Sequence, residues 1–132
     1  MKVLMNLYGD ETLKDVDTLE GIIRTMQAWG EFGQAAAAAG ALIACEALED
    51  AHTSTTVRID GGRRQITDGP FIETKEQLGG FIVMEVRDLD EALEWAERTP
   101  WNKDGCRTEI RPLMDYDAYA ARAGLAGGRA AS

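Results

Sequence analysis

The chain has 132 residues, of which 45% are hydrophobic, so it is long enough for one domain that buries a core without disulfide or metal staples. Its formal net charge of −9 repels phosphate backbones and argues against a nucleic-acid partner. No apolar run reaches the length of a membrane span, and residues 1–11 turn acidic too early for a secretory signal, so we expect a cytoplasmic protein without a membrane partner.

The first half of the chain predicts a strand, a helix and a second strand. In residues 2–8 successive side chains alternate between two faces, as in a strand. Residues 41–48 predict a second, apolar strand with one charged residue, Glu46. Between them, Asp17 and Glu20 are spaced as a capping box at the start of a helix that ends before Gly40. The helix carries an apolar stripe expected to face the core, formed by Leu19, Ile22, Ile23, Met26, Trp29 and then Phe32 or Gly33.

The second half predicts four strands and one more helix. Residues 55–60 and 63–67 read as two strands joined by a tight Gly-Gly turn. A strongly apolar strand follows at 80–86, then a helix over 88–99 with Asp88 and Glu91 as its capping box, and a last strand at 106–113. From residue 114 the chain is small and polar; we expect a turn or two of helix at 116–123 and disorder over 127–132.

Two helices cannot cover both faces of so wide a sheet. The order of elements therefore predicts an α+β, ferredoxin-like domain over residues 1–113, with a mainly antiparallel sheet, two helices on one face and an inserted β-hairpin, followed by a tail over 114–132. The uncovered face would still be partly apolar. A homodimer formed through that face is the simplest way to bury it.

The segment 66–80, ITDGPFIETKEQLGG, predicts a stiff loop rich in polar groups. Asp68, Gly69 and Pro70 each have turn chemistry, and the Asp68 carboxylate is expected to accept backbone hydrogen bonds worth about 1–2 kcal/mol. Phe71 is expected to anchor the loop in the core, and Thr74 with Gln77 to cap a one-turn helix. A rigid loop of this kind is where binding residues often lie, although ordinary turn chemistry explains the same residues.

These residues are similar to those of a known family. The strings DGPFIETKEQLGGF, DLDEALEWAERTP and EIRPL, together with MKVLMNLYGDE and GALIACEALEDAHTSTTVR, resemble the DGPF-domain branch of the YCII-related family over residues 1–113. The resemblance implies a dimeric ferredoxin-like fold of the dimeric α+β barrel type. Most members of the family have no assigned reaction, one relative eliminates chloride from a chloroaromatic compound, and some DGPF members are associated with sigma factors.

The resemblance also implies a catalytic pair of histidine and aspartate. Asp68 matches the motif, but the enzyme-like relatives place their histidine nearer the first helix, whereas the single histidine here is His52, in the loop after the second strand. His52 has the chemistry of a general acid or base, and a nearby Asp68 or Glu46 would orient it. An exposed loop histidine without a catalytic role is the competing interpretation.

Four further residues are candidates for binding a small polar organic ligand. Glu46 sits in an apolar strand, so it must face water, pair with a cation such as Arg58 or Lys75, or line a polar pocket. Tyr8, at the end of the first strand, would add a hydroxyl group to the same cleft.

The two cysteines, Cys45 and Cys106, match no metal-ligand spacing and are expected to be buried, reduced thiols. No phosphate-binding glycine loop or cofactor fingerprint is present, so neither a metal nor a cofactor is expected.

Two classes of function follow. The first is a homodimer with a small-molecule site between the sheet and the DGPF loop, with a lyase or dehydrochlorinase reaction as its enzymatic form. The second is a non-catalytic dimeric binding or signalling module associated with sigma-factor regulation.

Overall fold

The structure is a computed structural model that describes residues 1–125. Its strands are β1 (Lys2–Gly9), β2 (Leu42–Ala47), β3 (Thr55–Asp60), β4 (Arg63–Asp68), β5 (Gln77–Glu85) and β6 (Cys106–Pro112). Its helices are α1 (Leu19–Ala38), α2 (Leu89–Arg98) and α3 (Tyr116–Arg122), with short 3-10 turns η1 (Glu11–Lys14) and η2 (Ala51–Thr53). The disorder expected over 127–132 lies outside the described residues.

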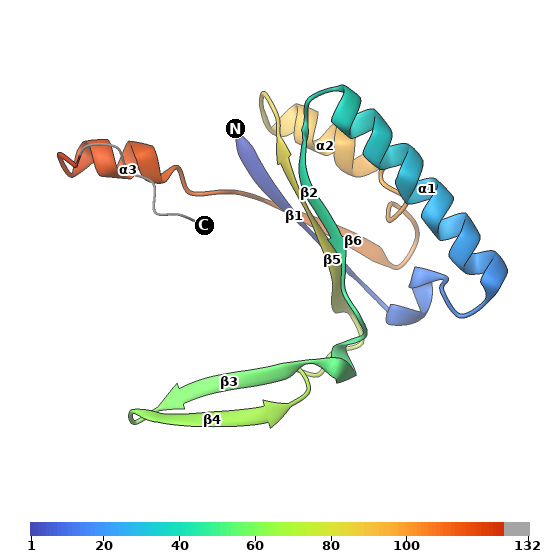
Figure 1. Cartoon of the computed structure of the whole chain (residues 1–132), viewed down its shortest axis with the longest axis horizontal. Helices are drawn as coiled ribbons and strands as arrows, with labels where there is room; N and C mark the ends of the chain where they lie inside the picture. Colours follow the sequence, from blue (N-terminus) through green and yellow to red (C-terminus); the bar gives the residue numbers. More distant parts are fainter. Residues whose placement is uncertain (126–132) are drawn as a thin grey trace.

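Four strands form the main sheet in the order β2-β5-β1-β6, and every neighbouring pair is antiparallel. Helices α1 and α2 lie on one side of this sheet (Figure 1). This order and the shared helical face are compatible with a ferredoxin-like fold.

The core fills the space between the sheet and the two helices. Alternate residues of β1 and β5 point into it because successive side chains of a strand face opposite sides. Phe32 of α1 packs edge-on against Trp95 of α2, with the ring centroids 6.0 Å apart. The buried apolar residues are, in chain order, Val3, Met5, Leu7, Phe32, Ala36, Ala41, Ile82, Met84, Val86, Ala92, Trp95 and Trp101.

The N-terminus of α1 differs from the prediction: Thr18, not Asp17, is the capping residue, and its hydroxyl accepts a hydrogen bond from the Gly21 N–H at 3.0 Å. Asp15 just before it adopts a left-handed backbone conformation and is held by Arg24 at 3.2 Å. That turn fixes where the helix can begin, and the sequence pattern alone did not reveal it.

The N-terminus of α2 follows the prediction closely. The Asp88 carboxylate accepts from the Glu91 N–H at 2.9 Å, and Glu91 reaches back to accept from the N–H of Arg87 at 2.7 Å. The bond to Asp88 satisfies a donor that the helix start leaves without an intrahelical partner, whereas Glu91 reaches one residue further back than a capping box predicts, to the residue before the cap.

Strands β3 and β4 form a separate two-stranded antiparallel sheet, which we call the β3–β4 arm (residues 55–68). Gly61 and Gly62 both have positive φ, as a type I′ turn requires, and this turn fixes the register. Val57 lies opposite Ile66, with Ile59 on the same face of the arm. The other face is polar and consists of Thr56, Arg58, Asp60, Arg63, Gln65 and Thr67.

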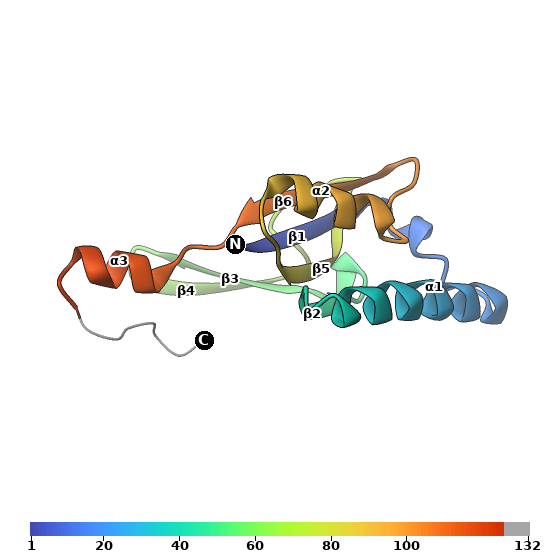
Figure 2. The same ribbon diagram turned by 90° about the horizontal axis from the view of Figure 1, so that it is seen from above.

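The arm projects away from the rest of the molecule (Figures 1 and 2). Apart from half-buried Thr56, all its strand residues are exposed, including the three large apolar ones. Its apolar face is therefore not covered by any of residues 1–125.

The loop between β4 and β5 does not contain the expected one-turn helix. The Gln77 side-chain amide does reach Thr74, but it donates to the Thr74 carbonyl at 2.9 Å instead of capping a helix. Gln77 already belongs to β5, where it pairs with Gly9, because extending an existing strand costs less than nucleating a helix. Phe71 is 82% exposed, so the expectation that it anchors the loop in the core is wrong.

The apolar stripe of α1 faces the core only toward its C-terminal end. Phe32 is buried and Trp29 packs against the core, whereas Leu19 is 73% and Met26 is 70% exposed. Toward its N-terminus α1 stands off from the sheet, because residues 24–26 and 28–29 border an open recess between the helix and the sheet instead of packing directly on the strands.

Candidate functional site

The two residues predicted to be catalytic do not form a pair. His52 is exposed on η2, and Asp68 is exposed at the end of β4. The two backbones approach each other, since the Gly69 N–H donates to the Ser54 carbonyl at 2.7 Å. No hydrogen bond or ion pair within residues 1–125 joins the His52 ring to Asp68 or Glu46.

Asp68 also lacks the turn role expected of it. The corner is held by the backbone of Gly69, whose N–H donates to Ser54 and whose carbonyl accepts from the Thr56 hydroxyl at 2.8 Å. The Asp68 carboxylate makes no hydrogen bond with any described residue. Gly69 has a φ of +97°, so the glycine and not the aspartate meets the conformational demand of this corner.

Glu46 and Arg58 lie in different parts of the molecule. The register pairs Glu46 with Phe81, and the side chain is exposed without an ion pair among the described residues. Arg58 is on the polar face of the arm, where it pairs with Asp60 at 3.1 Å. Glu46 therefore needs no cation, because water solvates it.

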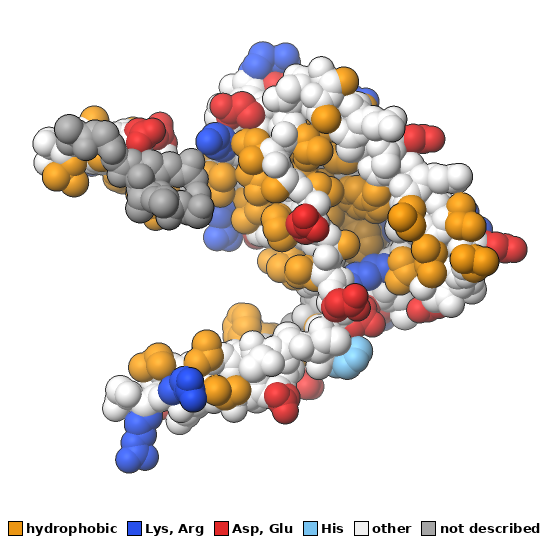
Figure 3. All heavy atoms as spheres, viewed as in Figure 1, with side chains coloured by type: hydrophobic (Ala, Val, Ile, Leu, Met, Phe, Trp, Pro, Cys, Tyr) orange, Lys and Arg blue, Asp and Glu red, His pale blue; other side chains and the backbone are white. Residues whose placement is uncertain are grey.

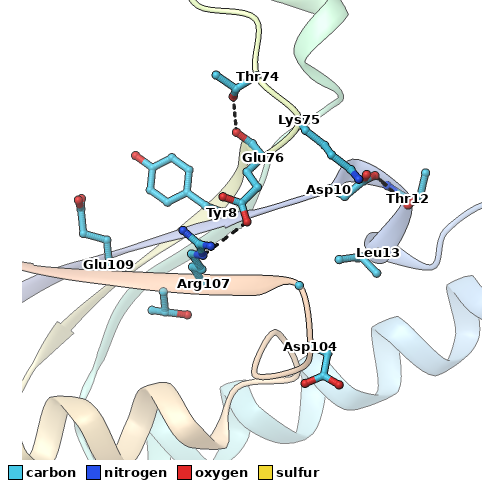
Figure 4. A pocket seen from close by; sticks show the side chains of 12 residues that line it. Tyr8, Asp10, Thr12, Leu13, Thr74, Lys75, Glu76, Asp104, Arg107 and Glu109 are labelled. Atoms are coloured by element: carbon cyan, nitrogen blue, oxygen red, sulfur yellow. Dashed lines mark hydrogen bonds and ion pairs between the residues drawn. The ribbon is translucent and has the colours of Figure 1, made fainter.

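Tyr8 and Lys75 do come together, in an open groove of about 1140 Å³ between the sheet and the loop after the DGPF motif (Figure 4). We call it the loop–sheet groove. Its lining residues are Tyr8, Asp10, Thr12, Leu13, Thr74, Lys75, Glu76, Asp104, Gly105, Arg107, Thr108 and Glu109. Of the six residues predicted for a site, it contains these two.

An ion pair that the sequence did not indicate crosses the groove. The Arg107 guanidinium on β6 lies 3.5 Å from the Glu76 carboxylate on the loop. Both side chains are substantially exposed, so the pair contributes only about 0–1 kcal/mol to stability. An incoming ligand can therefore take the place of either partner at little cost.

Asp10 provides a fixed negative charge at one end of the groove. The Thr12 backbone N–H and hydroxyl both donate to its carboxylate, at 3.0 and 2.8 Å, and Lys75 extends toward it (Figure 4). These hydrogen bonds, helped by the Lys75 charge, lower the pKa of Asp10 below its usual value. Asp10 is thus suited to accept hydrogen bonds from a ligand and not to donate a proton.

A second recess lies between α1, η1 and the β2–β5 edge of the sheet, and we call it the α1–β2 pocket. It has a volume of about 470 Å³, and its walls include Leu7, Trp29, Cys45 and Trp101. Figure 3 shows this hollow lined by hydrophobic side chains between β2 and α1. No sequence pattern indicated it, since its walls come from six separate segments of the chain.

Both thiols are free and half-buried, and burial raises the pKa of Cys45 and of Cys106 above the usual value for a thiol. No group of three metal-ligating side chains suited to a metal ion occurs within residues 1–125. In that same part of the chain no helix combines the length and apolarity of a membrane span.

The sequence matches the model of the YCII-related domain over residues 1–116, which includes every strand, α1 and α2. An uncharacterized protein of Rhizobium meliloti (strain 1021) is 34% identical over 110 residues, which make up 83% of this chain and 89% of that protein.

Proposed function

Because the chain belongs to the YCII-related family, we propose that it acts as a homodimer of the dimeric α+β barrel type, in which the loop–sheet groove binds a small polar organic ligand. Within the family we assign it to the DGPF-domain branch, on the basis of the motif at residues 68–71. The convergence of Tyr8, Lys75 and Arg107 on one groove is the observation that carries the ligand site.

The sheet face opposite the helices supports the dimer. Leu4 of β1 pairs with Val83 of β5, and Asn6 pairs with Phe81, so these side chains share the face that α1 and α2 leave open. They are only half-buried. A second copy placed on this face would bury them.

The β3–β4 arm gives independent support for a second copy. It projects on the side of the sheet that faces away from α1 and α2, as α3 does (Figure 1). An isolated two-stranded sheet is only marginally stable in water, so an amphipathic arm needs a surface on which to lie. A partner seated against the open face would lie next to that arm, and the two-fold symmetry of a closed dimer would give both arms the same contact.

The energetics require both surfaces. Association costs about 4–15 kcal/mol in lost translational and rotational freedom. Burying one side chain the size of Val, Leu or Phe gains about 1.5–3 kcal/mol. A two-fold dimer buries Leu4, Phe81 and Val83 of both copies, but these side chains are already half-buried and gain less than the full value. Val57, Ile59 and Ile66 of the arm, which are exposed, double the number of apolar side chains available.

The dimer is tested by neighbouring substitutions on opposite faces of the arm. Ile66→Asp puts a charge on the apolar face, and Gln65→Asp puts the same charge on the polar face. Light scattering coupled to gel filtration at micromolar concentration should give a dimer for the wild type and Gln65→Asp and a monomer for Ile66→Asp. A monomeric wild type, or equal behaviour of the two variants, would reject the dimer.

The groove would be bordered by the partner in such a dimer. Tyr8 and Arg107 pair with each other across β1 and β6, and both lie on the open face of the sheet. A ligand bound beside them would be shielded from bulk water, which strengthens its hydrogen bonds to the groove.

The ligand site is tested by thermal shift with a panel of small carboxylates and phenols. A ligand that prefers the folded state raises its apparent stability. We expect Tyr8→Phe and Arg107→Gln to abolish the shift. Arg63→Gln is the control, since Arg63 is exposed on the polar face of the arm and does not line the groove. A panel without any shift, or a shift that survives both groove variants, would contradict the site.

A further inference from the structure

We propose that the α1–β2 pocket is a second binding site, separate from the loop–sheet groove, and that it takes a flat aromatic molecule with one carboxylate. The pocket volume of about 470 Å³ falls in the range of about 300–1000 Å³ typical of small-molecule sites. Such sites are mainly apolar with a few polar groups that orient the ligand, and this pocket has that composition.

The pocket exists because neither α1 nor the sheet fills the space between them at this point. On the helix side, Trp29 lines the pocket, whereas Phe32, less than one turn further along α1, is buried in the core. On the sheet side, Gly79 lets the side chains of Lys14 and Trp101 approach the floor closely. A Cβ atom there would lie 3.2 Å from Lys14 Cε and 3.8 Å from Trp101 Cη2, so any larger residue would narrow the recess.

The walls favour an aromatic ligand. The indole rings of Trp29 and Trp101 both line the pocket, and the side chains of Leu7 and Pro100 add aliphatic surface. Aromatic rings bury a large apolar area and gain about 0.5–1.5 kcal/mol more from offset or edge-on contacts with other rings. A compact ring system therefore fits these walls better than a polar or highly charged molecule.

The charges at the rim favour a single carboxylate. Three cations line the pocket, but Arg24 is paired with Asp15 at 3.2 Å and Lys14 lies 3.5 Å from Asp50. Lys103 is different: its ammonium donates to the Leu13 carbonyl at 2.5 Å, and no carboxylate of residues 1–125 pairs with it. Glu46 also belongs to the lining, but it pairs with Phe81 in the register and so lies on the sheet face opposite the helices. Lys103 also lies 5.5 Å from the centroid of the Trp101 ring, so a cation without a carboxylate partner stands beside an aromatic wall and matches one anionic group on an aromatic ligand.

The test uses 2-naphthoate as the probe and 2-naphthamide as its neutral counterpart, titrated into the full chain by isothermal calorimetry. We expect one site per chain for both. Lys103→Gln should weaken 2-naphthoate about tenfold, the scale of one charge-assisted hydrogen bond, and change 2-naphthamide less than twofold. Equal effects on both probes would overturn the assignment of the carboxylate to Lys103.

A matched pair of substitutions on α1 locates the site. Ala28 lines the pocket, whereas Ala37 is exposed on the same helix outside it. Ala28→Leu should weaken 2-naphthoate at least tenfold, and Ala37→Leu and Tyr8→Phe should change it less than twofold. Loss of binding in Tyr8→Phe would instead place the probe in the loop–sheet groove and reject this site.

The wild type offers a readout that needs no variant. Cys45 lines the pocket and Cys106 does not. Saturating 2-naphthoate should slow alkylation of Cys45 by iodoacetamide at least fivefold and leave the rate at Cys106 unchanged, as followed by peptide mass spectrometry. Absence of saturable binding, or equal protection of both thiols, would overturn the proposal.

Discussion

The body of the molecule, which is the main sheet with α1 and α2, and the β3–β4 arm show the same alternation of apolar and polar residues. The apolar face is buried in the body and exposed in the arm. In β1 the inward residues Val3 and Met5 are fully buried beneath the helices. In the arm the equivalent apolar face, Val57, Ile59 and Ile66, is exposed along its whole length. The alternation of apolar and polar residues therefore specifies which face of a strand is apolar, but the position of the other elements determines whether that face is buried.

This contrast separates residues that stabilise one chain from residues available to another. A change in the body should alter the free energy of unfolding whatever the protein concentration. A change on the arm should leave the single chain almost unaffected, and act only through a partner.

The largest expected effect comes from replacing a phenylalanine of the body by alanine, and the same replacement beside the arm should have almost no effect. Phe32 is 5% exposed and contacts both Trp29 and Trp95 edge-on, so Phe32→Ala should lower the free energy of unfolding by about 3–5 kcal/mol. Phe71→Ala, beside the arm, should change it by less than about 0.5 kcal/mol in a single chain. Urea unfolding measures both. A large loss at Phe71 would show that a partner already covers the loop.

The next effect tests how tightly the body is packed at the sheet edge. A Cβ atom on Gly80 would lie 2.7 Å from the Glu46 carbonyl oxygen, and this backbone atom cannot move aside easily. Gly80→Ala should cost about 1–3 kcal/mol. Gly30→Ala, where no atom lies within 4 Å of the new methyl group, should instead stabilise α1 slightly, by up to about 1 kcal/mol. Thermal unfolding measures both variants. A lower melting temperature in Gly80→Ala alone would show that the steric clash, and not alanine in itself, destabilises the protein.

A pH effect is expected at the start of α2. The Arg87 N–H, and then the Trp95 indole N–H at 3.3 Å, donate to Glu91 and lower the pKa of its carboxyl. A carboxyl with a lowered pKa in the folded state contributes stability above its unfolded pKa and loses it as the pH falls through the folded pKa.

Glu91→Gln should therefore be less stable than the wild type at neutral pH, and the gap should close on acidification below the ordinary glutamate range. Urea unfolding at a series of pH values checks this. Glu94→Gln on the exposed side of α2 is the control. A gap that stays constant with pH would mean that the charge of Glu91 is not involved.

The smallest effect is expected at Asp68. Its carboxylate has no hydrogen-bond partner among the described residues, so Asp68→Ala should change the stability by less than about 0.5 kcal/mol, not by the 1–2 kcal/mol expected from turn chemistry. Thr18→Ala, which removes a real helix cap, should cost about 1 kcal/mol. Equal losses in the two variants, measured by thermal unfolding, would restore a structural role for Asp68.

Local patterns were enough to predict most of the body. The alternation in β1, the Asp88 cap of α2 and the Gly40 stop of α1 each depend on residues close together in the chain, and each is present in the structure. The exposed part of the α1 stripe and the exposed Phe71 were not predictable in this way, because periodicity indicates an apolar face without indicating what lies opposite it.

The candidate site was predicted less well than the fold. Tyr8 and Lys75 share a groove, but Arg58 lies on the projecting arm and Glu46 at the β2 edge of the sheet. Which polar side chains meet depends on the angle at which the arm leaves the sheet, and no local spacing encodes that angle. Arg107 was missed because an arginine near the start of an edge strand is an ordinary surface residue in the sequence.

Trp101 forms part of the partition between the two recesses. It lines the α1–β2 pocket, and its indole N–H donates at 3.0 Å to the backbone carbonyl of Tyr8, which borders the groove. The emission of this one fluorophore should therefore respond to occupancy on either side of the partition. Replacing Trp29 and Trp95 by phenylalanine would leave a chain whose intrinsic fluorescence reports on both cavities in a single titration.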